Sequence, residues 1–329
     1  MGSSQQSSTG QRQTSAAQAR ARGPRRLHLY AFCFVSLAAT STFAGYEASR
    51  FGGASWVNSG LVHAANVASA PAEPLASPAI ADLSRLAPQE QAQNLLERAI
   101  ARDRESLDLI AKNVDRWRGH LRDDGHLYEL VHAGMNSNDL RVRGAAVEID
   151  LAANNLSKSP ETVARLVKKL RDSPTDRPWT LWRLGALGNR GVQPDFVLAQ
   201  LLTYAHDRDE DTRYWAVEGL AILGSDAAVD PLLDRFAHDR SPRVRQRAAS
   251  NLAQAGMLSR EQRLAAVPQL LNFFDDDALD SATRGWVYGT LRMITGVQLG
   301  NDANAWRKWW AKRDATTHNT HVPTKILYA

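Results

Sequence analysis

Apolar residues recur three and four positions apart along most of the chain after residue 90, which is the spacing of an amphipathic α-helix. The first run extends from Leu96 through Val114 to Leu121, and Asp103 occupies one position where an apolar residue is expected. We predict one long amphipathic helix over 91–123. Its apolar face would either cap the helices that follow or form a coiled coil, and the short, interrupted seam favours the cap.

A sequence repeat follows this helix. The motif Ala205-His206-Asp207-Arg208 returns 32 residues later as Ala237-His238-Asp239-Arg240. Extending this alignment in both directions brings five arginines into register, 32 to 39 residues apart. These arginines are Arg143, Arg177, Arg213, Arg245 and Arg284. Eleven or twelve residues after each arginine comes a residue type that tolerates the left-handed conformation in which helices end. The residues at these predicted helix ends are Asn154, Gly188, Gly224, Gly256 and Gly296.

Each unit also has room for a helix before its arginine. We expect these first helices near 127–133, 161–171, 195–206, 227–238 and 262–274. Two helices in every unit, with no strand pattern between them, predict an all-α solenoid over 124–297. Tetratricopeptide repeats have a similar length, but their W-x-x-L-G-x-x-Y pattern is absent from this sequence.

The segments Asp139-x-x-Val142-Arg143-x-x-Ala146, Asp209-x-x-Thr212-Arg213-x-x-Ala216 and Asp280-x-x-Thr283-Arg284 resemble the D-x-x-V-R-x-x-A core of short HEAT repeats, which also occur in phycobilin lyases. Two units depart from this pattern, since they carry Ser173 and Ser241 in the aspartate position. The resemblance implies a right-handed α-α superhelix of about five helix pairs, with the second helices lining its concave surface. It also implies that the repeated aspartates and arginines form a structural ladder between neighbouring repeats. This ladder comprises Asp139, Arg143, Arg177, Asp209, Arg213, Arg245, Asp280 and Arg284.

The chain closes with a tryptophan-rich segment, Asp302-Ala303-x-x-Trp306-x-x-Trp309-Trp310. This segment looks like the cap that follows such repeats in exported bacterial proteins. We therefore expect 298–329 to form a C-terminal cap and tail.

A column of large side chains accompanies the repeat arginines. Two residues after each arginine come Ala145, Trp179, Trp215, Arg247 and Trp286. On a helix this position lies about 150° from the centre of the expected core face, and Trp182 and Met293 lie on the same side. Exposed aromatic and arginine side chains in a concave surface are typical of binding hot spots. We therefore take six residues as candidates for binding a partner: Trp179, Trp182, Trp215, Arg247, Trp286 and Met293. The alternative, that these side chains pack between neighbouring helices, stays open.

The sequence of residues 1–90 predicts an export signal followed by a linker. Residues 1–26 are rich in Ser, Gln and Arg and are predicted to be disordered. The apolar run 27–45 fits a signal peptide or a signal-anchor helix, and 46–90 is an Ala-, Ser- and Pro-rich tether. Because arginines before such a run stay in the cytoplasm, we expect the rest of the chain in the periplasm, anchored to the inner membrane, or secreted if the run is cleaved.

Charge and chemistry narrow the function. Of the 40 basic and 35 acidic residues, six and one lie in 1–50, which leaves 34 of each for the rest of the chain. A neutral body argues against nucleic acid as a partner. The only cysteine is Cys33, and no motif points to a catalytic residue, a cofactor or a metal. We predict a non-catalytic scaffold that binds a protein or peptide. The alternative is a HEAT-type enzyme, similar to pigment lyases or to DNA glycosylases, that acts on a bound small molecule or base.

Overall fold

The computed structural model describes residues 83, 85–122 and 124–319, and within these residues it is all-helical. The predicted disordered segment 1–26, the signal or anchor 27–45 and most of the tether 46–90 lie outside the described residues. No helix in the described part of the chain has the length and apolar character needed to cross a membrane. The α-helices are α4 (Pro88–Ile100), α5 (Arg104–Trp117), α6 (Gly125–Met135), α7 (Leu140–Ala153), α8 (Pro160–Asp172), α9 (Arg177–Asn189), α10 (Pro194–Ala205), α11 (Glu210–Leu223), α12 (Val229–His238), α13 (Pro242–Ala253), α14 (Arg260–Ala265), α15 (Val267–Asn272), α16 (Ser281–Thr295) and α17 (Ala303–Asn319).

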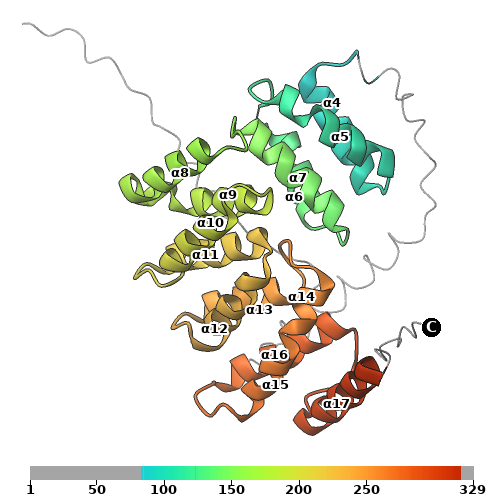
Figure 1. Ribbon diagram of the computed structural model, residues 1–329, viewed down its shortest axis with the longest axis vertical. Coiled ribbons are helices and arrows are strands. Elements are labelled where there is room, and N and C mark those ends of the chain that lie inside the picture. The colour runs from blue at the N-terminus through green and yellow to red at the C-terminus, as the bar shows by residue number, and fades with distance from the viewer. Residues whose placement is uncertain (1–82, 84, 123, 320–329) are drawn as a thin grey trace, which may run out of the picture. The chain divides into compact units, whose positions relative to one another are not determined.

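Successive helices pack as pairs, and the pairs follow one another along the chain (Figure 1). In each predicted repeat the helix that carries the repeat arginine is the second of its pair, so that α7, α9, α11, α13 and α16 are the second helices. The first helix of the last pair is divided into α14 and α15. Pro268, near the start of α15, has no amide hydrogen to continue the helix from α14. The arrangement is consistent with a HEAT-like solenoid.

The prediction of one long helix over 91–123 is wrong. The structure has two helices, α4 and α5, separated at Arg102, which adopts a left-handed φ of 73°. Asp103 begins the second helix, because its side chain accepts a hydrogen bond from the amide of Glu105 at 3.0 Å. The polar residue in an apolar position thus marks a helix start. The α4–α5 pair packs on α6–α7 as a further helix pair.

Side chains in the repeated aspartate position begin the second helices. Asp139, Asp209 and Asp280 accept hydrogen bonds from amides in the first turns of α7, α11 and α16, at 2.9, 2.7 and 2.7 Å. Ser241 does the same for α13. Such caps satisfy amides that have no partner within the helix. The backbone bonds from Thr212 and Thr283 lower the pKa of Asp209 and Asp280 below the ordinary carboxyl value.

Two of the five predicted helix ends have the expected left-handed residue directly after the helix. Gly224 and Gly296 follow α11 and α16 with left-handed φ values of 61° and 76°. Gly188, by contrast, lies inside α9, where a β-carbon would come within 2.6 Å of the Leu223 side chain. Its small size therefore serves helix packing rather than helix termination.

Two further glycines bring α9 and α11 close together. A β-carbon on Gly185 would lie 2.2 Å from the carbonyl oxygen of Gly219, and one on Gly219 would lie 2.7 Å from that of Leu181. The backbones of these two helices are therefore in direct contact, and α9 packs extensively on α11. The α7–α9 junction is different, since these helices pack only slightly.

Candidate functional site

Three repeat arginines bind an aspartate of the next repeat. Arg213 donates from Nε and Nη2 to the two carboxylate oxygens of Asp239, at 2.8 and 3.0 Å, and both side chains are buried. Arg245 donates to Asp280 at 2.7 Å. Arg177 lies 3.5 Å from Asp207. These contacts link the second helix of one repeat to the loop of the following repeat.

Two of these acceptors were missed in the sequence. Asp207 and Asp239 precede the helix-capping position by two residues, whereas Asp139 and Asp209 cap their own helices. The signal was present, because Asp207 and Asp239 are the aspartates of the repeated Ala-His-Asp-Arg motif. The aspartate of the repeated motif therefore forms an ionic contact between repeats.

Arg143 breaks this pattern. Its side chain donates from Nη1 to the carbonyl oxygens of Gln254 and Gly256, at 2.7 and 2.6 Å, more than 100 residues along the chain. In the third and fourth repeats the acceptor aspartates, Asp207 and Asp239, lie six residues before the repeat arginine. In the second repeat, which follows Arg143, this position is occupied by Arg171. Arg143 thus lacks an acidic acceptor there. Arg284, in the last repeat, is half-buried on α16.

The six candidate binding residues differ in exposure. Trp182, Trp215 and Arg247 are only 5%, 7% and 8% exposed. The other three, Trp179, Trp286 and Met293, are half-buried. Trp179 of α9 contacts Trp215 of α11 with ring centroids 5.2 Å apart, so these rings pack between neighbouring second helices. Burial favours the packing alternative for Trp182 and Trp215.

Arg247 holds a buried ion pair. Its guanidinium donates from Nε and Nη2 to the carboxylate of Glu218 on α11, with the second bond at 2.7 Å. Burial opposes the charge on Arg247, but the adjacent carboxylate outweighs this effect and raises the pKa of the arginine. Asn251 donates a further hydrogen bond to Glu218 at 3.2 Å. The column residue of α13 therefore contacts the preceding second helix through an ion pair, whereas the column residue of α11 does so through a ring contact.

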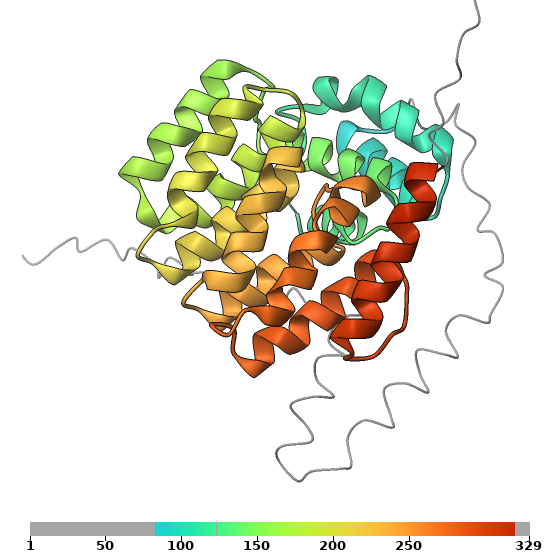
Figure 2. The ribbon, with the colours of Figure 1, turned by 60° about the horizontal axis from the view of Figure 1, so that its bottom comes forward.

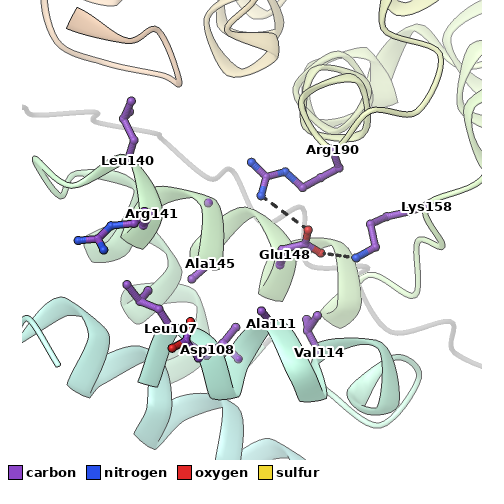
Figure 3. A pocket seen from close by; sticks show the side chains of 12 residues that line it. Leu107, Asp108, Ala111, Val114, Leu140, Arg141, Ala145, Glu148, Lys158 and Arg190 are labelled. Atoms are coloured by element: carbon purple, nitrogen blue, oxygen red, sulfur yellow. Dashed lines mark hydrogen bonds and ion pairs between the residues drawn. The ribbon is translucent and has the colours of Figure 1, made fainter. Parts of the chain in front are cut away.

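The first member of the column is small, and a groove lies beside it. Ala145 on α7 stands where three of the other four repeats have tryptophan, and a cavity of about 490 Å³ lies beside it, lined by α5 and α7 (Figure 3). Apolar side chains of α5 form one wall of the cavity, and charged side chains line other parts of it. The lining residues are Leu107, Asp108, Ile110, Ala111, Val114, Leu140, Arg141, Gly144, Ala145, Glu148, Lys158 and Arg190.

Charges gather at one end of the groove. Glu148 accepts a hydrogen bond from Lys158 at 3.0 Å and lies 3.7 Å from Arg190 at the end of α9 (Figure 3). Gly144 allows this arrangement, since a β-carbon there would lie 3.2 Å from the Arg190 guanidinium. Near the other end, Arg141 pairs with Asp139 at 2.6 Å, and Asp108 adds to the rise in the pKa of this arginine. The groove is therefore apolar along α5, with charges of both signs at its ends.

The histidines and carboxylates of the described residues form no group of three that could hold a metal ion. Two carboxylates line the groove, and one of them, Glu148, lies between the cations of Lys158 and Arg190.

A family model matches the central helices. It is described as HEAT repeats, and it matches residues 163–253. The matched segment runs from within α8 to the end of α13 and includes the Arg177–Asp207 and Arg213–Asp239 contacts. It supports the description of this chain as a HEAT-repeat protein. None of the curated proteins compared with the chain matches it.

Proposed function

We propose that this HEAT-repeat protein is a non-catalytic scaffold that binds a segment of another protein in the groove between α5 and α7. HEAT repeats commonly mediate protein–protein interaction. The observation that supports this site is the cavity beside the small residue Ala145, since the column residue Trp215 instead packs against Trp179 of the preceding second helix.

The composition of the groove suits a peptide. Its volume of about 490 Å³ lies in the range of small-ligand pockets, and it can receive one or two apolar side chains. Leu107 and Ala111 lie one helical turn apart on one face of α5, and neither is fully buried, so they offer apolar contact to a bound segment. Lys158 and Arg190 at one end can bind carbonyl or carboxylate oxygens of the same segment. An apolar centre with a polar rim is the usual anatomy of a protein interface.

Peptide display on the full chain tests this site. Ala111 is exposed on α5 and lines the groove, so Ala111→Trp fills the groove from a position that tolerates a large side chain. The neighbouring Lys112 is exposed and does not line the groove, which makes Lys112→Trp the matched control. Fluorescence anisotropy of a selected peptide should show an affinity about tenfold lower for Ala111→Trp, equivalent to about 1.4 kcal/mol, and an unchanged affinity for the control. Equal binding by both variants would place the site elsewhere, and failure to enrich any peptide would count against the scaffold function.

The enzymatic alternative makes a different prediction. A HEAT-type enzyme similar to pigment lyases or DNA glycosylases should retain a small molecule or a base during purification. Native mass spectrometry of the full chain would detect such a ligand as added mass. That result would favour the alternative over a protein-binding scaffold.

We further propose export to the periplasm, either anchored or released. This proposal rests on the basic segment and the apolar run in residues 1–45. A C-terminal reporter enzyme that matures only outside the cytoplasm should become active. The N-terminal sequence of the mature protein distinguishes an anchored chain, which keeps residues 27–45, from a cleaved one. An inactive reporter with an intact cytoplasmic chain would contradict export.

A further inference from the structure

The N-terminal block, defined as helices α4–α7, has a hydrophobic core of its own. Buried apolar side chains from all four helices form one cluster, which includes Leu96, Ile110, Trp117 and Ile149. The Trp117 indole also donates to Gln91 at 3.0 Å, which joins α5 to α4. These contacts make the block a compact unit that can move as one body.

The block joins the following repeats through a junction with few backbone contacts, and α7 buries Val147 and Leu151 outside the block's own core. Helix α7 packs only slightly on α9, and the groove extends from the block to Lys158 and Arg190 beyond it. Ion pairs cross this junction, among them Glu148–Lys158 at 3.0 Å and Asp150–Arg183 at 3.3 Å. The connection 154–159 contains Asn155 in a left-handed conformation, with φ of 51°. The repeat ladder is also missing here, because Arg143 does not bind the second repeat. Nothing at this junction resembles the backbone contact between α9 and α11.

One contact ties the block to a distant repeat instead. Arg143, only 6% exposed, donates to the carbonyls of Gln254 and Gly256 in the loop after α13. We call this contact the Arg143 bridge. Figures 1 and 2 both show α14, which follows this loop, beside the α6–α7 pair. Since the last carbonyls of a helix lack partners and carry partial negative charge, this loop is a suitable acceptor for a cation.

A second buried arginine lies near this contact. Arg263 is buried on α14 and donates to four carbonyls, including those of Asn251 and Ala255. Burial lowers the pKa of Arg263 to about 10, and the charge of Arg143 contributes to this decrease. His132 of α6 faces Arg247, and burial together with this charge lowers the pKa of the histidine. The Arg143 bridge therefore forms although Arg263 carries a charge of the same sign nearby.

We propose that the N-terminal block turns about the 154–159 connection, and that the Arg143 bridge holds it in the closed position of this structure. Opening separates α6 from Arg247 and moves Arg190 away from the end of the groove, whose walls α5 and α7 both belong to the block. The effect on partner binding rests on the proposed function of the groove. The movement itself does not, because it needs no partner.

Distances between spin labels test the movement in the full chain with Cys33→Ser. Cysteines at Ala133 on α6 and Arg260 on α14, both exposed, report across the bridge. A second pair, at Ala133 and Lys112, lies within the block and serves as the control. Arg143→Met removes the bridge, and Arg141→Met removes an exposed arginine of the same helix that does not take part in it.

The expected result is a second, longer distance for the 133–260 pair in Arg143→Met, with the 112–133 distance unchanged and with no effect of Arg141→Met. An unchanged 133–260 distance would overturn the proposal, because the block would then be held without the bridge. Broadening of both pairs would overturn it too, since Arg143 would then support the fold of the block rather than its position. Either outcome leaves the peptide-binding experiment on the groove independent, because that experiment measures affinity and not distance.

Discussion

Replacing Gly185 by alanine tests the close approach of α9 and α11. In an exposed helix interior, glycine to alanine stabilises a protein by about 1 kcal/mol. At Gly185 the new β-carbon would lie 2.2 Å from the carbonyl oxygen of Gly219, whereas ordinary contacts begin at 3.4 Å. Because the neighbour is backbone, no side chain can rotate away, so the helices must separate by about 1 Å. A gap of that size removes a quarter to a half of the dispersion energy across the interface.

The two effects oppose each other, and packing should win. Overpacking of a tight core costs about 1–3 kcal/mol, and a clash with backbone belongs at the upper end. We expect Gly185→Ala to destabilise the chain by about 2 kcal/mol and to lower the melting temperature by roughly 4–8 °C. Circular dichroism at 222 nm during heating measures this change.

Gly285 on α16 provides the matched control. It is also a helix-interior glycine, but a β-carbon there meets nothing within 4 Å. Gly285→Ala should raise the melting temperature by roughly 2–4 °C, following helix propensity alone. If Gly185→Ala were stabilising to the same degree as Gly285→Ala, the close approach of α9 and α11 would be refuted.

Three further predictions follow from buried contacts and caps. Asp239→Ala leaves Arg213 buried without its carboxylate and should cost about 3–5 kcal/mol in urea unfolding. The control is Asp211→Ala, which breaks the exposed pair of Asp211 with Arg243 and should cost at most about 1 kcal/mol; similar losses would contradict the buried pair. Trp215→Ala removes a packed ring and should cost about 3–5 kcal/mol by the same measurement. Unchanged stability with weaker partner binding would instead indicate that Trp215 is an exposed binding residue. Capping lowers the pKa of Asp209 below its ordinary value of 3.8, so its stabilisation is present above that value and is lost as the pH falls through the folded-state pKa. Asp209→Ser keeps a cap that does not titrate, so thermal melts below about pH 4 should show a smaller acid-induced loss than in the natural chain; an equal loss would exclude this carboxylate as a source.

Local rules of helix formation could be read from the sequence. The aspartates before the second helices act as caps, because a side chain two or three residues before an amide needs no tertiary contact to reach it. Gly224 and Gly296 end helices for the same local reason. The break at Asp103 was also visible in the sequence as a polar residue in an apolar position, but the apolar spacing on either side favoured one long helix. The structure shows that the capping residue outweighs that spacing.

Contacts between repeats could not be read in the same way. Identical column positions hold an open groove beside Ala145, a ring contact at Trp215 and an ion pair at Arg247, because each outcome depends on the side chains of the neighbouring helix.

The sequence by itself determined the helices, their caps and the period of the repeat, since these depend on residues a few positions apart. Only the tertiary structure decided where Arg143 binds. Its acceptors are backbone carbonyls more than 100 residues away, and a carbonyl carries no signature in the sequence. The tertiary structure also decided which tryptophans are buried, because burial depends on how closely adjacent second helices approach. For α9 and α11 that approach is set by two glycines facing each other.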